Sequence, residues 1–293
     1  MPWTEIRFTT NRQHADELSD FLHESGAVAV TFQEGGNQQI FEPAPGETPL
    51  WDETHILGLF EQDQNIDAVI SNLKTRFTES KFPTYELAQI QDQDWERAWL
   101  TDFKPMKFGE KLWIIPSEFS PEDDEAVNIY LDPGLAFGTG THATTSLCLS
   151  WLDANRPEGK KTIDYGCGSG ILAIAAVKLG ASDVSAVDID PQAIDATQVN
   201  AEKNRVENSI KCYLAETFKT QSADLLLANI LASTLVDLAE NFHAQLRPGG
   251  QIVVSGILNE QTQDVLTEYK KWFEMNKPET LDGWVLLSGW KPS

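Results

Sequence analysis

The chain has 293 residues, of which 41% are hydrophobic and 23% charged, a composition typical of a globular protein long enough for two domains. Its formal net charge of −23 disfavours binding to nucleic acid, because affinity for phosphates comes mainly from lysine and arginine. The sequence has no apolar run near the roughly 20 residues of a membrane span, and it begins without the basic and apolar regions of a signal peptide. We therefore expect a cytoplasmic protein with no nucleic-acid or membrane partner, whose acidity serves either solubility or the recruitment of a basic partner.

The first 90 residues predict a small α+β domain. Helical spacing of apolar residues indicates two helices, and four apolar runs indicate strands, in the order βαββαβ of the ferredoxin-like plan. The strands are expected at 3–9, 27–33, 55–61 and 85–90, and the helices at 14–24 and 66–77. Residues 1–91 contain no catalytic constellation, so we interpret them as a substrate-recognition domain, with a scaffold that binds nothing as the alternative.

Residues 92–110 are expected to form a linker helix and connection to a second domain, residues 111–293. Trp95 and Trp99 are four residues apart and share a helix face, which favours packing on a domain over lining a substrate groove. Strands are expected at 111–116 and 128–131.

Residues 131–153 (LDPGLAFGTGTHATTSLCLSWLD) contain three glycines and then a cluster of threonines at the start of a predicted helix. The glycines indicate a loop that closes on something, and the hydroxyl groups can cap the helix or touch a ligand. His142 could act as a base, but no neighbour in the sequence fixes its tautomer, so we interpret it as a loop or capping residue.

Residues 162–188 predict a nucleotide site built as strand, glycine turn, helix, strand and acid. The turn reads DYGCGSG, with glycines at alternate positions from Gly166, and Asp188 ends the second strand. A helix that begins after such a turn presents free N–H groups, and an acid at the tip of the next parallel strand can accept both ribose hydroxyls. Position 171 is Ile, so the GxGxxG pattern of a dinucleotide site fails. This counts against a nicotinamide-dependent oxidoreductase; a non-catalytic nucleotide-binding protein and a purely structural turn are further alternatives.

The remaining chain predicts an open, mostly parallel α/β sheet. Helices are expected at 190–204, from 232 through 242 and at 260–274, and strands at 210–214, 223–228 and 251–257. A turn is expected at 246–250, and closing strands, with antiparallel pairing as one alternative, through 283–287. Ligands of such sheets lie outside the carboxyl ends of the strands. Gly166, Asp188, residues 215–216 and Asn229 all lie at such ends. The three cysteines (Cys148, Cys167 and Cys212) show no metal-ligand spacing, so we expect reduced thiols and no metal.

Four motifs carry a resemblance to one family over essentially the whole chain: DPGLAFGTGTH (132–142), DYGCGSGILAIAA (164–176), VDIDP (187–191) and LANILA (227–232). The chain resembles the class I S-adenosylmethionine-dependent methyltransferases, and among them the bacterial methyltransferases of ribosomal protein L11. The resemblance implies an N-terminal ferredoxin-like domain that grips the substrate and a C-terminal Rossmann-like domain, with a mostly parallel seven-stranded sheet, that holds S-adenosylmethionine.

The resemblance also implies which residues form the site: Phe137, Thr145, Gly166, Gly168, Asp188 and Asn229 contact the cofactor. Asn229 is the candidate catalytic residue, because its amide lies where methyl donor and amine meet. In related amine and amide methyltransferases two prolines and an aromatic often follow this Asn, but here the tetrad is NILA. The missing aromatic disfavours a planar amide or base as acceptor and suits an aliphatic amine.

The resemblance implies methylation of lysine side chains and the N-terminal α-amino group of ribosomal protein L11, a basic substrate that we expect to be free before ribosome assembly. We expect a monomeric enzyme without a dedicated catalytic base, because solvent can take the proton. The alternative is an enzyme of the same fold that acts on another basic protein or a small amine.

Overall fold

The structure is a computed structural model that describes residues 3–36, 50–77, 82–90, 104–123, 125–132 and 142–293. The chain divides into two compact units, Met1–Ala98 and Trp99–Ser293, which are described separately. The helix predicted around Trp95 and Trp99 and the glycine-rich segment with Phe137 lie outside the described residues.

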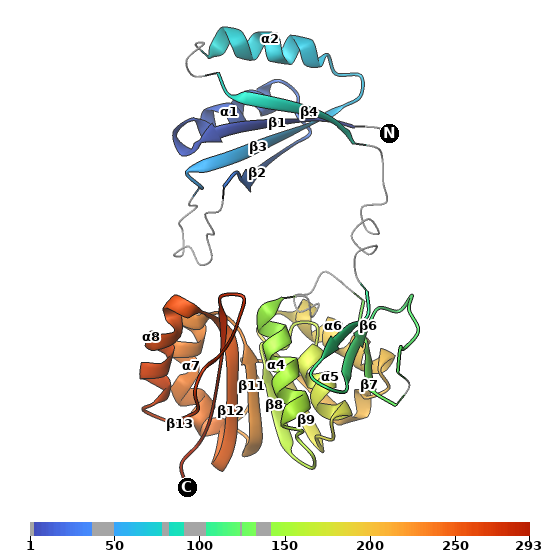
Figure 1. Ribbon diagram of the computed structural model, residues 1–293, viewed down its shortest axis with the longest axis vertical. Coiled ribbons are helices and arrows are strands. Elements are labelled where there is room, and N and C mark those ends of the chain that lie inside the picture. Colours follow the sequence, from blue (N-terminus) through green and yellow to red (C-terminus); the bar gives the residue numbers. More distant parts are fainter. Residues whose placement is uncertain (1–2, 37–49, 78–81, 91–103, 124, 133–141) are drawn as a thin grey trace. The chain divides into compact units, whose positions relative to one another are not determined.

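The N-terminal unit contains a four-stranded antiparallel sheet and two helices (Figure 1). Its elements are β1 (Trp3–Asn11), α1 (Arg12–Glu24), β2 (Ala29–Glu34), β3 (Glu53–Glu61), α2 (Ile66–Arg76) and β4 (Thr84–Ile90), in the predicted order. The strands lie in the order β2-β3-β1-β4. Asn11 and Asn65 cap the two helices, because their side chains accept backbone N–H groups of the first turns.

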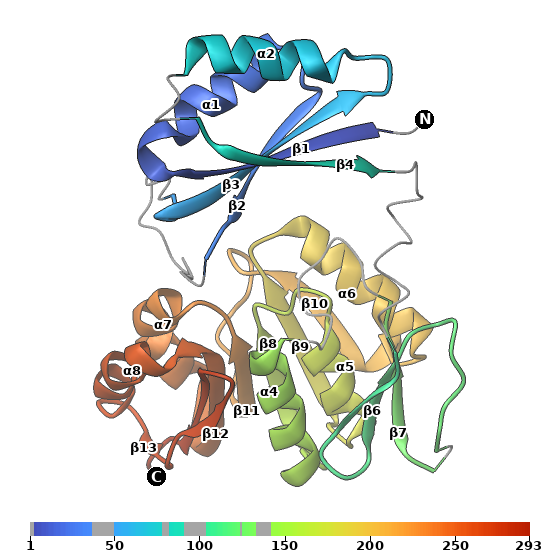
Figure 2. The same cartoon turned by 45° about the horizontal axis from the view of Figure 1, so that its top comes forward.

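One core holds this unit together. Ile6 and Phe8 of β1 alternate with partly exposed residues, so they lie on one face of the sheet, where both helices pack (Figure 2). Leu18 and Leu22, one helical turn apart, are the corresponding buried positions of α1.

The C-terminal unit begins with a three-stranded sheet of β5 (Met106–Phe108), β6 (Leu112–Ile115) and β7 (Val127–Tyr130). β6 and β7 are parallel, and β5 is antiparallel to β6. The strands β6 and β7 were predicted, whereas the three-residue β5 was too short to give a pattern.

The large sheet has five parallel strands and an antiparallel end. β8 (Lys161–Tyr165), β9 (Asp183–Asp188), β10 (Ile210–Leu214), β11 (Ala223–Asn229) and β12 (Leu246–Leu258) are parallel. β15 (Trp284–Trp290) pairs antiparallel with β12, and the short strands β13 (Glu274–Met275) and β14 (Glu279–Leu281) pair with the other edge of β15. The order is β10-β9-β8-β11-β12-β15-β13, with β14 beside β15. The sheet therefore has eight strands rather than the expected seven, since two short strands share its last position.

Helices cover both faces of this sheet (Figure 1): α4 (Ala143–Ala154), α5 (Ile171–Lys178) and α6 (Pro191–Lys203) on one, α7 (Ala232–Gln245) and α8 (Thr262–Tyr269) on the other. Alternate residues of β11 supply the two cores, because Leu225 and Leu227 face α4 and α5 while Leu226 and Ala228 face α7. Burial on both faces explains the continuous apolar run of this strand. In the described residues, no helix has the length and apolar character needed to cross a membrane.

Two predicted boundaries are wrong. The turn expected at 246–250 belongs to β12, where the pairing with β11 moves from Leu246 directly to Gln251 and so bypasses the glycines. The helix expected at 260–274 ends at Tyr269, because Phe273 enters the core and the residues after it pair with β15.

Candidate functional site

The carboxyl ends of three neighbouring strands bring the predicted site residues to one edge of the sheet. β8 lies between β9 and β11, and Tyr165 at its end is paired with Val187 on one side and Ala228 on the other. The chain therefore leaves β8 at Gly166, β9 at Asp188 and β11 at Asn229 within one row. This is the edge at which ligands of open α/β sheets bind.

The glycine turn after β8 has a backbone that only glycine adopts easily. Gly166, Gly168 and Gly170 have φ values of +78°, +53° and +78°. The N–H groups of Gly166 and Cys167 both donate to Val187 O, at 2.8 and 3.1 Å, and Gly170 N–H donates to Cys167 O at 2.7 Å. The turn is thus fastened to β9 and leads directly into α5, whose N-cap is Gly170.

Asp188 is held at the tip of β9 by two backbone donors. Its Oδ2 accepts the N–H of Gly168 at 2.9 Å, and its Oδ1 accepts the N–H of Asp190 at 3.0 Å. The side chain is partly exposed. A carboxylate oxygen has two acceptor positions, so an oxygen that takes one N–H can also accept a hydroxyl of a ligand. The arrangement fits the predicted contact with a ribose.

Ile230 packs between two glycines next to the site. A Cβ on Gly166 would overlap Ile230 Cγ2, and a Cβ on Gly256 of β12, whose φ is +90°, would overlap Ile230 O. Sequence reasoning assigned the missing Cβ of Gly166 to the approach of a ligand, whereas the structure shows that a protein side chain requires it. Gly256 was not predicted, because nothing in its own strand indicates that the β11–α7 turn lies against it.

Asn229 and Thr145 meet although 84 positions separate them. Asn229 Nδ2 donates to Thr145 Oγ1 at 3.2 Å. Thr145 lies in the first turn of α4 and is 2% exposed, while Asn229 at the end of β11 is partly exposed. The structure thus brings together two residues that the resemblance placed in the site.

His142 is the N-cap of α4, which confirms its interpretation as a capping residue. Its Nδ1 accepts the N–H of Thr144 at 3.4 Å and lies 2.8 Å from Thr144 Oγ1, and its ring meets the ring of Trp284 edge-on, 4.7 Å between centroids. The prediction that no neighbour in the sequence fixes the tautomer of His142 was wrong. A backbone N–H can only donate, so Nδ1 is the acceptor and the proton of the neutral ring is on Nε2.

Two exposed apolar side chains at the strand ends were missed by sequence reasoning. Ile189, directly after Asp188, is 83% exposed, and Leu231, two residues after Asn229, is 55% exposed. Their signal in the sequence was an apolar residue within two positions of each strand end, but exposure depends on what packs nearby. Ala215 follows β10 beside Asp188, since its N–H donates to Asp188 O at 2.9 Å.

Asp164, the next-to-last residue of β8, is a buried carboxyl below the glycine turn. It is 1% exposed, its Oδ2 accepts the N–H of Ala173 at 2.9 Å, and its Oδ1 has no hydrogen-bond partner among the described residues. Burial raises the pKa of Asp164 to about 7; the Ala173 bond lowers it, and the nearby Asp188 carboxylate raises it.

The cysteines are not arranged for metal binding within the described part of the chain. That part contains no group of three His, Cys, Asp or Glu side chains that could hold an ion. Cys148 and Cys167 are buried, Cys212 is partly buried, and burial raises the pKa of all three thiols.

Comparison with known proteins gives the same result over the whole chain. A family model described as "Ribosomal protein L11 methyltransferase (PrmA)" matches residues 2–292. Proteins named ribosomal protein L11 methyltransferase from Shewanella woodyi and Pseudomonas putida are 50% and 48% identical over 291 and 290 residues, 99% of both chains in each case. The crystal structure of a ribosomal protein L11 methylase from Lactobacillus delbrueckii subsp. bulgaricus matches with a TM-score of 0.60 and 31% identity, over 65% of this chain and 100% of that one. The mixed α/β fold is therefore methyltransferase-like, and the chain belongs to the ribosomal protein L11 methyltransferase (PrmA) family.

Proposed function

We propose that this protein transfers methyl groups from S-adenosylmethionine to lysine side chains and the N-terminal α-amino group of ribosomal protein L11. Family membership and the names of the relatives support the activity and the acceptor. The structural observation that carries the proposal is the convergence of the glycine turn, Asp188 and Asn229 on one edge of the large sheet.

The residues at this edge fit S-adenosylmethionine, a ligand with a ribose but no phosphate. Asp188 is oriented by the N–H groups of Gly168 and Asp190, so its remaining acceptor positions suit two neighbouring hydroxyl groups. The exposed side chain of Ile189 offers an apolar surface for the face of the base. Gly166 and Gly168 form the turn that borders the methionine part. When bound, the cofactor supplies a methyl group on a sulfonium centre.

Asn229 is proposed to align the substrate amine. Its Nδ2 is engaged by Thr145, which fixes the plane of the carboxamide and leaves Oδ1 as the group that accepts an N–H of the amine. In-line displacement moves positive charge from sulfur to nitrogen, so alignment and exclusion of water supply much of the acceleration. Phe137, in the segment that lies outside the described residues, is proposed as a further cofactor contact.

The substrate amine must lose its proton before it attacks. A lysine has a pKa of about 10.4 and an α-amino group one of about 8, so the α-amine begins closer to the reactive form. His142 is used as the N-cap of α4 and is edge-on to Trp284. We therefore propose that no side chain serves as a dedicated base and that water accepts the proton.

The N-terminal unit is proposed to hold the protein substrate. Its element order and strand order are those of the ferredoxin-like plan, which supports residues 1–91 as a separate recognition domain, 92–110 as the connection and 111–293 as the catalytic domain. Residues alternating with the buried positions of β1 and β3 line a hollow of about 380 Å³, namely Arg7, Thr9 and His55, together with Thr84, Tyr85 and Glu86.

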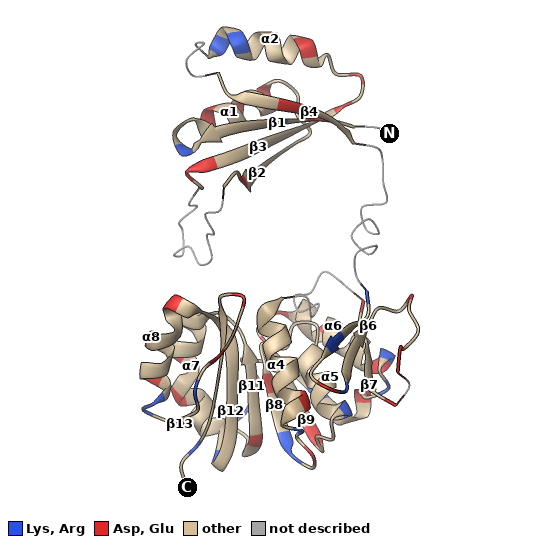
Figure 3. Ribbon diagram, viewed as in Figure 1, with Lys and Arg blue, Asp and Glu red and all other residues tan. Residues whose placement is uncertain are grey.

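The charge of the chain supports a free, basic substrate. Aspartate and glutamate are spread over both units (Figure 3), and the net charge is −23. Such a surface attracts a basic protein and repels the phosphates of RNA, which favours ribosomal protein L11 before assembly as the acceptor. We propose that the enzyme acts in the cytoplasm as a monomer.

Calorimetry with S-adenosylmethionine and with a nicotinamide dinucleotide tests the cofactor. Only S-adenosylmethionine is expected to bind. Asp188→Asn is expected to weaken it about tenfold or more, because both hydroxyls lose a charged acceptor and the new amide nitrogen can accept neither a hydroxyl nor a backbone N–H. Binding of the dinucleotide alone would contradict the proposal. Methyl transfer to purified ribosomal protein L11 then tests the reaction itself.

A further inference from the structure

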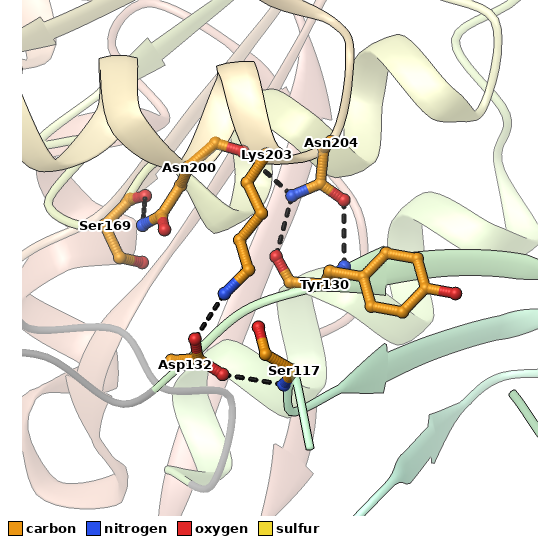
Figure 4. A network of polar contacts seen from close by, with 7 residues as sticks. All are labelled: Ser117, Tyr130, Asp132, Ser169, Asn200, Lys203 and Asn204. Carbon is orange, nitrogen blue, oxygen red and sulfur yellow. Dashed lines mark hydrogen bonds and ion pairs between the residues drawn. The ribbon is translucent and has the colours of Figure 1, made fainter. Parts of the chain in front are cut away.

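The carbonyl groups of the glycine turn are bound by side chains of α6. Thr197 Oγ1 lies 3.1 Å from Gly168 O and 3.3 Å from Cys167 Sγ. The carbonyl oxygen is the stronger acceptor, so the hydroxyl proton belongs on that bond. Asn200 Nδ2 donates to Ser169 O at 2.8 Å (Figure 4). Two consecutive peptide groups of the turn are therefore oriented from the side of α6.

Two N–H groups of this turn are held as well. Gly168 N–H donates to Asp188 Oδ2, and Gly170 N–H donates to Cys167 O. The approach of α6 is close, because a Cβ on Gly170 would lie 2.8 Å from Thr197 Cγ2. Thr197 itself is fully buried. Thus each bond fixes a peptide plane, and with it the direction of the carbonyl and of the N–H that follows.

We propose that Thr197 and Asn200 are positioning residues of the cofactor site, which hold the glycine turn in its binding conformation before S-adenosylmethionine arrives. The inference rests on the proposed function. A turn that is held in advance binds at its intrinsic affinity, whereas a turn that samples other conformations binds in proportion to its competent fraction. Loss of either side-chain donor should therefore weaken the cofactor without removing any direct contact to it.

α6 also supplies a matched control on the same helix. Asn204, the C-cap of α6, is 5% exposed and pairs with β7: its Nδ2 donates to Tyr130 O at 2.7 Å, and its Oδ1 accepts Tyr130 N–H at 2.8 Å (Figure 4). It is an asparagine bound to backbone like Asn200. Its Nδ2 also lies 2.9 Å from the backbone carbonyl of Asn200 within α6, but none of its partners belongs to the glycine turn. Asn204→Asp should lower the melting temperature and leave cofactor affinity unchanged.

The test measures the dissociation constant of S-adenosylmethionine by calorimetry for the full chain. Thr197→Val keeps the shape and removes the hydroxyl, and it should weaken binding about three- to tenfold; Thr197→Ser keeps the hydroxyl and should restore most of the affinity. Asn200→Asp replaces the donor by a carboxylate that repels Ser169 O, and it should weaken binding about tenfold or more. If Asn204→Asp does not fold, Lys203→Ala takes its place, because Lys203 forms an ion pair with Asp132 away from the turn.

Hydrogen exchange of the free protein adds a measurement that needs no ligand. Exchange of the peptide that covers residues 166–171 should rise in Thr197→Val and Asn200→Asp but not in Asn204→Asp. Wild-type affinity in Thr197→Val and Asn200→Asp, or equal loss in Asn204→Asp, would overturn this inference alone. Wild-type protein that does not bind S-adenosylmethionine would overturn the proposed function and the inference together.

Discussion

The amide of Asn229 donates a hydrogen bond to the buried hydroxyl of Thr145, at 3.2 Å. This bond joins the end of β11 to the first turn of α4, and it fixes the plane of the side chain proposed to align the amine. The proposed role of this bond is to orient Asn229 for the substrate amine, and this role requires neither an acid nor a base. Thr145 should therefore affect turnover through Asn229.

Thr145→Val should lower kcat about tenfold, because the isosteric side chain cannot accept the Asn229 amide and the carboxamide becomes free to rotate. Thr145→Ser keeps the acceptor and should retain most of the activity. The measurement is the rate of methyl transfer at saturating S-adenosylmethionine and protein substrate. Equal rates for the valine and serine variants would show that the bond does not orient Asn229.

Gly166→Ala should destabilise the protein by about 2 kcal/mol or more, since the new Cβ overlaps Ile230 Cγ2 and φ is +78°. Ile230→Ala removes the overlap but not the backbone strain. The free energy of unfolding of the double variant should therefore exceed, by about 1 kcal/mol, the value expected if the two single-variant losses were additive. Urea unfolding of all four proteins gives this coupling. Strict additivity would mean that Ile230 does not set the requirement for glycine.

Asp164→Asn should stabilise the free protein at high pH. The pKa of the buried Asp164 is raised from about 3.9 when unfolded to about 7 when folded, so the folded state binds the proton more tightly. The contribution of Asp164 to stability therefore falls as pH rises between these values, and the difference between variant and wild type should grow in favour of the variant by up to a few kcal/mol. Urea unfolding of variant and wild type at about pH 5 and pH 8 measures this change. Taking the difference between the two proteins at each pH removes the contributions of the other titrating groups. A pH-independent difference would contradict it.

His142→Ala should lower the free energy of unfolding by about 1 kcal/mol through loss of the α4 cap, and His142→Asn, a good capping residue, should recover part of it. Both variants should still methylate the substrate, because the ring is not assigned to proton transfer. Turnover is compared with cofactor affinity in each. Complete loss of turnover in His142→Ala with unchanged affinity would make His142 the base.

Removal of residues 1–91 should leave S-adenosylmethionine binding near the wild-type value, because the glycine turn, Asp188 and Asn229 all belong to the C-terminal unit. Methylation of the protein substrate should fall strongly, since the proposed recognition domain is lost. Calorimetry and transfer assays on the truncated chain give the two numbers. Full activity in the truncated protein would remove the recognition role.

The parts of the site that were predictable lie close together in the sequence. The strand, glycine turn, helix and Asp188 follow one another within residues 162–188, and periodicity with glycine spacing indicates their order. The bond between Asn229 and Thr145 was not predictable as a contact, because it depends on how α4 packs against the sheet. The same holds for the contact of Ile230 with Gly256.

Boundaries failed where the pattern was short or where tertiary pairing decided the outcome. Strands β5 and β13 have three and two residues, too few for alternation to be visible. The sequence of residues 246–250 is typical of a turn. These residues nevertheless lie within β12, because β11 pairs with Leu246 before the glycines and with Gln251 after them. The burial of Asp164 was not predicted either, because both faces of its strand become buried only when the helices pack on the sheet.

The most direct test of the account is transfer of a labelled methyl group from S-adenosylmethionine to purified ribosomal protein L11, followed by mass spectrometry of the product over a range of pH. The account predicts label on lysine side chains and the N-terminal amine, lost in Asn229→Ala and severely reduced in Asp188→Ala. Wild-type protein that binds S-adenosylmethionine but leaves ribosomal protein L11 unlabelled at every pH would contradict it.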